Sequence, residues 1–159
     1  MFEQIEMAPP DAILGLTEAF RKDCRPGKIN LGVGVYKDED NSTPVFESVK
    51  RAEERLLRSE QTKSYLPIPG EAAYGNAVQE LVFGSGHEAV SAGRVVTAQT
   101  PGGTAALRVA GDFIHRMFPA ARIWVSVPTW ENHRGVFNAA GLEVMAYPYY
   151  DEEHKSLAF

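Results

Sequence analysis

The spacing of apolar and polar residues predicts helices in the first half of this 159-residue chain. Apolar side chains there recur three or four positions apart, which is typical of amphipathic helices. One helix is expected after Asp11 as its cap, and a second of about 15 residues from Thr43 as cap and Pro44 as first residue. A third is expected over roughly 72–83. The second and third should bury apolar stripes that include Phe46, Val49, Ala52, Leu56, Leu57, Ala73, Ala77, Leu81 and Val82.

Short apolar runs alternate with helical patterns in the second half of the chain. The expected order is a strand, a helix, a strand, a helix and a strand over Val95–Ala98, Gly103–Phe118, Arg122–Val127, Glu131–Ala140 and Leu142–Tyr147. This alternation predicts βαβ units and a parallel sheet. The predicted fold class is α/β, with an N-terminal arm and helices leading into the start of a three-layer αβα, mostly parallel sheet. A parallel sheet is covered on both faces, so three strands and two helices should leave apolar surface open. We therefore expect the front portion of a larger protein.

Composition narrows the classes of partner. The formal net charge is −5 and the pI is about 5.4, which argues against binding to nucleic acid or to an anionic membrane. Cys24 is the single cysteine, so no disulfide can form within the chain, and a cytoplasmic location is expected. The N-terminus has no signal-peptide pattern, and no apolar run approaches the roughly 18 residues that span a bilayer.

A glycine-rich turn follows the run Val95–Ala98 and opens the next helix. Gly102, Gly103 and Thr104 expose backbone N–H groups at the positive end of a helix dipole, beside a hydroxyl. Such a turn can hold a phosphate dianion. Glycines at a helix start are more often plain turn or capping residues, so this turn alone does not identify a site.

A second candidate group follows the strand that ends at Val127, where ligands bind in open α/β sheets. Trp130 offers a flat indole for stacking, and His133 offers a titratable imidazole. The alternative is a capped helix start with a core tryptophan and a surface histidine. Similarly, Gly34 can mark a strand kink, and Tyr65 can anchor a loop. Motifs for a Walker-type nucleotide site or a metal site are absent.

Five segments taken together resemble the aspartate/aromatic aminotransferase family, which is of fold type I and depends on pyridoxal 5′-phosphate. The resemblance covers essentially the whole chain, and five matches in the family's order are more specific than any one alone. The segments are Asp11–Leu16, Asn30–Glu39, Lys63–Ile68, Thr100–Thr104 and Val125–His133. The resemblance implies an N-terminal arm and small-domain segment over 1–43 and the first part of the large cofactor-binding domain over 44–159.

The resemblance also implies roles for single residues. Gly102, Gly103 and Thr104 would bind the cofactor phosphate, and Trp130 would lie against the cofactor ring and orient a substrate carboxylate. His133 would support the aspartate that pairs with the ring nitrogen. Gly34 would line the substrate pocket. Tyr65 would reach the phosphate in the neighbouring subunit of a homodimer.

The implied reaction is transfer of an amino group from an amino acid to 2-oxoglutarate. Val35, Lys37, Thr43 and Thr104 together resemble the aspartate-preferring members, with some activity on aromatic amino acids expected. Ala105 departs from the family's usual glycine. None of the six lysines has the context of the family's cofactor lysine, so the chain alone should be inactive. The alternatives are a non-catalytic module that binds a phosphorylated ligand and a fragment that pairs with intact subunits.

Overall fold

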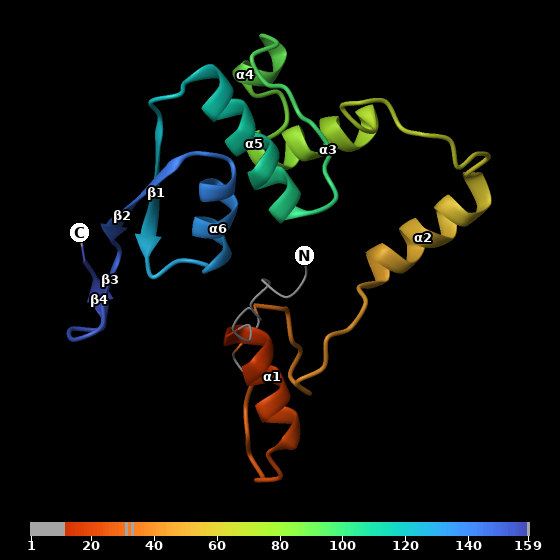
Figure 1. Ribbon diagram of the computed structural model, residues 1–159. Coiled ribbons are helices and arrows are strands. Elements are labelled where there is room, and N and C mark those ends of the chain that lie inside the picture. The colour runs from red at the N-terminus through yellow and green to blue at the C-terminus, as the bar shows by residue number, and fades with distance from the viewer. Residues whose placement is uncertain (1–11, 31, 33, 159) are drawn as a thin grey trace, which may run out of the picture. The chain divides into compact units, whose positions relative to one another are not determined.

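The computed structural model describes residues 12–30, 32 and 34–158, and Figure 1 shows their secondary structure. The chain divides between Lys63 and Ser64 into two compact units, each described here by itself. The expected domain boundary between residues 43 and 44 concerns the complete fold and stays a prediction. No helix within the described residues is both long and apolar enough to cross a membrane.

The first unit contains two helices, α1 (Ala12–Lys22) and α2 (Glu47–Ser59). The helix expected after Asp11 is therefore present, although Asp11 itself and the arm before it lie outside the described residues. The described residues of the segment 29–36 form no strand.

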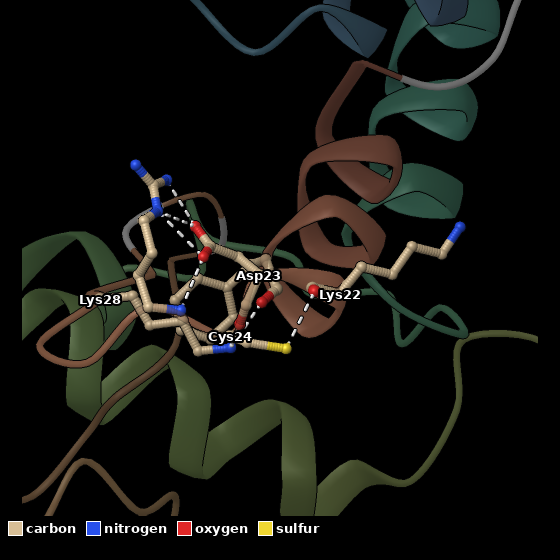
Figure 2. Close-up of polar contacts among 6 residues, drawn as sticks. Lys22, Asp23, Cys24 and Lys28 are labelled. Atoms are coloured by element: carbon tan, nitrogen blue, oxygen red, sulfur yellow. Dashed lines mark hydrogen bonds and ion pairs between the residues drawn. The ribbon is translucent and has the colours of Figure 1, made fainter.

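A lysine and an ion pair lie at the C-terminal end of α1 and hydrogen-bond there (Figure 2). Lys28 Nζ donates hydrogen bonds to the carbonyl oxygens of Phe20 and Asp23, at 2.7 and 2.6 Å, and lies 4.3 Å from the centre of the Phe20 ring. Its positive charge thus sits where the helix dipole is negative. Beside it, Arg25 Nε donates to both carboxylate oxygens of Asp23 at 2.9–3.0 Å. The Arg25 guanidinium lowers the pKa of the Asp23 carboxyl below its ordinary value.

The sequence prediction for α2 is wrong at its start and on its buried face. The helix begins at Glu47 after an extended cap residue, Phe46, rather than at Pro44. Proline favours an extended residue before it, and the β-branched and aromatic residues after it are weaker helix formers than the Glu, Lys, Arg and Leu that follow. No residue of α2 is buried, and Leu57 is 84% exposed. The stripe has no covering surface among the described residues.

The second unit begins with the helix expected over 72–83. Helix α3 (Ala72–Phe83) is capped by Glu71, whose carboxylate accepts a hydrogen bond from the Ala73 N–H, and it ends at Gly84 with φ 90°. A short helix that the sequence did not predict, α4 (Glu88–Ser91), follows. The apolar stripe expected to pack is exposed here too, with Leu81 85% accessible.

A βαβ unit forms the packed part of the second unit. Helix α5 (Gly103–Met117), strand β1 (Arg122–Val127), helix α6 (Asn132–Ala139) and strand β2 (Glu143–Pro148) follow in the predicted order. The two strands pair in parallel, with Arg122 opposite Glu143 and Val127 opposite Pro148. Helix α6 packs against both α5 and β2 (Figure 1). The buried apolar residues are Val125, Val136, Phe137, Ala140 and Leu142.

The strand expected over 95–98 is absent. This segment has no regular secondary structure and no strand partner among the described residues, and a strand exists only through its ladder of hydrogen bonds. A short antiparallel pair, β3 (Tyr150–Asp151) and β4 (Ser156–Leu157), was not predicted. The fold is therefore mixed α/β with a small parallel sheet. Apolar surface remains open as expected, with Trp124 57% and Val96 90% exposed.

Candidate functional site

The start of α5 presents three backbone N–H groups that find no acceptor among the described residues. Gly102 caps the helix in an extended left-handed conformation, with φ 93° and ψ 172°, and no side chain caps the end. The first hydrogen bond of the helix runs from the Ala106 N–H to the Gly102 carbonyl at 3.1 Å. The N–H groups of Gly103, Thr104 and Ala105 therefore have no acceptor in the described part of the chain. Three free donors at the positive end of a helix dipole fit an anion.

The approach to these donors is open. A β-carbon added at Gly102 or Gly103 would meet no heavy atom within 4 Å. Thr104 is exposed, so its hydroxyl is available beside the amides. Thr100 Oγ1 donates to the Gly102 carbonyl at 3.1 Å, and the Gly102 N–H donates to the Thr100 carbonyl at 2.8 Å. These two bonds hold the turn that sets the direction of the amides, so the residues present fit a phosphate group.

Trp130 and His133 lie together just after β1. Their rings meet edge to face, with centroids 5.3 Å apart and planes at 86°. His133 Nδ1 shares a 2.8 Å hydrogen bond with Thr129 Oγ1. This bond orients the imidazole, and Nε2 has no hydrogen-bond partner within the described residues. Trp130 is 42% exposed, so part of this residue is accessible to a ligand.

A hollow of about 310 Å³ lies between His133, the sheet and α5, and Trp130 is not part of its lining. Its lining includes Ser126 from β1, Thr129 from the segment after β1, His133 from α6 and Leu107 from α5. Leu107 lies only one turn beyond Gly103. The structure thus brings His133 to a cavity that borders the early part of α5.

Tyr65 lies on a loop whose end is hydrogen-bonded to the residue that precedes the glycine turn. The loop closes with a hydrogen bond from the Gly70 N–H to the Pro67 carbonyl at 2.8 Å, and the Gln99 N–H donates to the Pro69 carbonyl at 2.9 Å. The side chains of Tyr65 and Ile68 are fully exposed. The side chain of Tyr65 is therefore not packed within the described part of the chain, and its expected role in a second subunit stays a prediction.

Gly34 belongs to the first unit and is exposed in a segment without regular secondary structure, and no described heavy atom lies within 4 Å of where its β-carbon would be. No group of three or more histidine, cysteine or acidic side chains that could hold a metal occurs in the described part of the chain.

Sequence reasoning missed two polar side chains that organise this region, Thr129 and Gln99. The spacing of Thr129 and His133, four apart across a helix start, is a signal that could have suggested their contact. The contact of Gln99 with Glu71 spans 28 positions, and no local pattern signals it.

Comparison with known proteins shows the family to which this chain is similar. Residues 26–159 match the family described as aminotransferase class I and II. The chain is 58% identical to the aspartate aminotransferase of Salmonella typhi over all 159 residues. It spans about 40% of that relative's length.

Solved structures agree with the fold. The chain is similar to an aromatic amino acid aminotransferase from Burkholderia cenocepacia, with 51% identity and a TM-score of 0.89 over 96% of this chain and 38% of the other. It is also similar to the aromatic-amino-acid aminotransferase of Burkholderia pseudomallei, with 48% identity and a TM-score of 0.91 over 99% and 40% of the two chains. The latter structure is covalently bound to pyridoxal phosphate.

Proposed function

This chain belongs to the class I and II aminotransferase family, and we propose that it supplies the phosphate-binding part of an aspartate aminotransferase dependent on pyridoxal 5′-phosphate. The observation that carries the proposal is the set of free amides of Gly103, Thr104 and Ala105 at the start of α5. Their donors suit the phosphate ester of that cofactor.

The amides and the Thr104 hydroxyl hold the phosphate dianion in this proposal. Gly102 makes their arrangement possible, because its φ of 93° and ψ of 172° are accessible essentially only to glycine. Binding through fixed backbone dipoles positions the phosphate, which in turn positions the attached ring for chemistry.

The segment after β1 acts on the ring. Trp130 would cover one face of the ring with its indole and exclude water, and its N–H would orient a substrate carboxylate. His133, held by Thr129, offers Nε2 to a carboxylate that pairs with the ring nitrogen. Bound pyridoxal phosphate supplies an electron sink that stabilises negative charge at the α-carbon of the substrate.

The remaining assignments of the proposal concern the complete protein. Gly34 lines the substrate pocket, and the exposed Tyr65 serves the phosphate in a second subunit of a homodimer. The substrates are an amino acid and a 2-oxo acid, with 2-oxoglutarate as acceptor. The location is cytoplasmic, on the evidence of the lone Cys24.

Aspartate is the proposed amino donor, with weaker activity on aromatic amino acids. Identity supports this order, because it is 58% to the Salmonella typhi aspartate enzyme and 51% and 48% to the two aromatic enzymes. Val35, Lys37, Thr43 and Thr104 are the residues in this chain on which the preference rests.

A chimera tests the function. The corresponding N-terminal part of the Salmonella typhi aspartate aminotransferase is replaced by this chain, and kcat/KM is measured for aspartate and for phenylalanine with 2-oxoglutarate. We expect transfer from both, with aspartate preferred. A folded chimera that binds the cofactor but transfers from neither donor would contradict the proposed function. A preference for phenylalanine would contradict the proposed substrate.

A further inference from the structure

Gln99 connects two segments that lie far apart in the sequence. Its backbone N–H donates to the Pro69 carbonyl at 2.9 Å, and its side-chain Oε1 accepts from the Glu71 N–H at 2.9 Å. Glu71 is the cap of α3, and Pro69 ends the loop that carries Tyr65. Gln99 also directly precedes Thr100, where the glycine turn begins. One residue therefore joins the Tyr65 loop, the start of α3 and the approach to α5.

The lack of space around Gly70 shows how closely Gln99 packs against the loop. A β-carbon at Gly70 would lie 2.3 Å from Gln99 Cβ and 2.7 Å from its Oε1, distances that no real contact allows. Gly70 also has φ +90°, a conformation that favours glycine. Only glycine thus lets the loop lie against Gln99. The adjoining hollow of about 290 Å³ has the loop as one wall and Gln99, Thr100 and Pro101 as the other.

The segment before Gln99 is held separately. Gln79 Nε2 on α3 donates to Thr97 Oγ1 at 2.9 Å, and Gly75 lies close to the same threonine. This bond fastens residues 95–98 to α3 without touching the Tyr65 loop. Residues 97–99 are thus held by two glutamine contacts of 2.9 Å, and of these two only the contact of Gln99 reaches the loop.

We propose that Gln99 is a positioning residue that couples the Tyr65 loop to the glycine turn at the start of α5. The inference rests on the proposed function, which gives the loop and the turn each a phosphate to bind. In a homodimer these two phosphates belong to different active sites. Because Gln99 contacts the loop and continues into the turn, ordering of the turn by an anion restricts the loop as well. Occupancy of one site thereby favours the loop position that the neighbouring site needs.

Amide hydrogen exchange of the 159-residue chain tests the contact itself. Gln99→Leu removes the acceptor, and we expect the Glu71 N–H to exchange about fivefold faster, the effect of one lost hydrogen bond. Gln99→Glu keeps an oxygen acceptor and should retain the slow exchange. Gln79→Leu is the matched control, because it loosens the same segment from α3, and Glu71 should keep its protection. Unchanged exchange at Glu71 in Gln99→Leu would overturn the inference.

Inorganic phosphate tests the coupling in the same samples. In the unaltered chain and in Gln99→Glu, phosphate should shift the amide resonances of Gly103–Ala105 and also slow exchange at Glu71. In Gln99→Leu the resonance shifts should remain while the slowing at Glu71 is lost. Shifts at 103–105 without slowing at Glu71 in the unaltered chain overturn the coupling and leave the proposed site intact. If phosphate shifts none of the resonances of residues 103–105, the proposed site is contradicted. The contact is then judged by the effect of Gln99→Leu without phosphate.

Discussion

Gly102 and Gly103 are adjacent but face different backbone requirements. Gly102 has φ 93°, whereas Gly103 is the first residue of α5 and has a helical backbone. Neither would meet a neighbour through a β-carbon, so the backbone alone decides the effect of substitution. Gly102→Ala should lower the free energy of unfolding by about 1–3 kcal/mol, the cost of a strained residue. Gly103→Ala should be neutral or stabilising by up to about 1 kcal/mol.

Denaturant unfolding of the two variants measures this difference. Gly84→Ala is a matched control, because Gly84 has φ 90° and equally open surroundings at the end of α3. It should lose about as much stability as Gly102→Ala. Equal stability of Gly102→Ala and Gly103→Ala would contradict the backbone conformation assigned to the turn.

Asp23 should make the stability of the first unit depend on pH in the acidic range. Arg25 lowers the folded-state pKa of this carboxyl, so the unfolded chain binds a proton at a higher pH than the folded chain does. The stabilisation is present above the unfolded pKa of about 3.9 and is lost as pH falls through the folded value. The Arg25 side chain is 85% exposed and no part of the pair is fully buried, so the effect should be small. Asp23→Asn should flatten the fall in melting temperature at acidic pH, whereas Asp40→Asn, at a carboxyl that forms no ion pair with another described residue, should not.

The packing of α5 on α6 depends on one small residue. Gly111 is buried, and a β-carbon there would lie 2.9 Å from Ala140 Cβ and 3.4 Å from Phe137 Cδ1. Gly111→Ala should therefore destabilise the second unit by about 1–3 kcal/mol through overpacking, despite the better helix propensity of alanine. Gly15→Ala in α1 is the control, because that position is open and should gain stability. Thermal unfolding that moves both variants upward would contradict the close approach of the two helices.

The elements that the sequence predicted well are those whose signals are local. Helix α3 and strand β1 match the predicted bounds, and α5 and β2 match within one residue, because apolar periodicity and flanking turns define them. The strand expected over 95–98 failed because strand formation depends on a partner elsewhere in the chain. The stripe on α2 failed for the same reason, since burial requires a second surface.

In the candidate site, too, the features with a local sequence pattern could be predicted and the others could not. Gly102–Thr104 could be found from the sequence, because a glycine-rich helix start has a recognisable pattern, and Trp130 with His133 followed from their place after a strand. The contacts of Gln99 with Pro69 and Glu71 could not, since they join residues about 30 positions apart. Side-chain geometry, such as the Thr129–His133 bond, also required coordinates.

The whole chain should not catalyse transamination by itself. The second unit contains one lysine, Lys155, which is exposed in the turn between β3 and β4 and lies in none of the hollows described above. Without a suitably placed amine, a family member cannot hold its cofactor covalently. A coupled aspartate–2-oxoglutarate assay on the 159 residues should therefore read the rate of free pyridoxal phosphate. Turnover above that rate, with the chimera as positive control, would contradict this prediction.

The central claim is that the amides at the start of α5 bind the phosphate of the cofactor. Titration with pyridoxine 5′-phosphate, which has no aldehyde to react with lysines, tests this claim most directly when each amide resonance is followed. The account predicts saturable shifts centred on Gly103, Thr104 and Ala105, weakened by Gly102→Ala and unchanged in affinity by Gly84→Ala. Shifts centred on other residues would contradict it. So would a result in which both variants bind equally and more weakly than the unaltered chain.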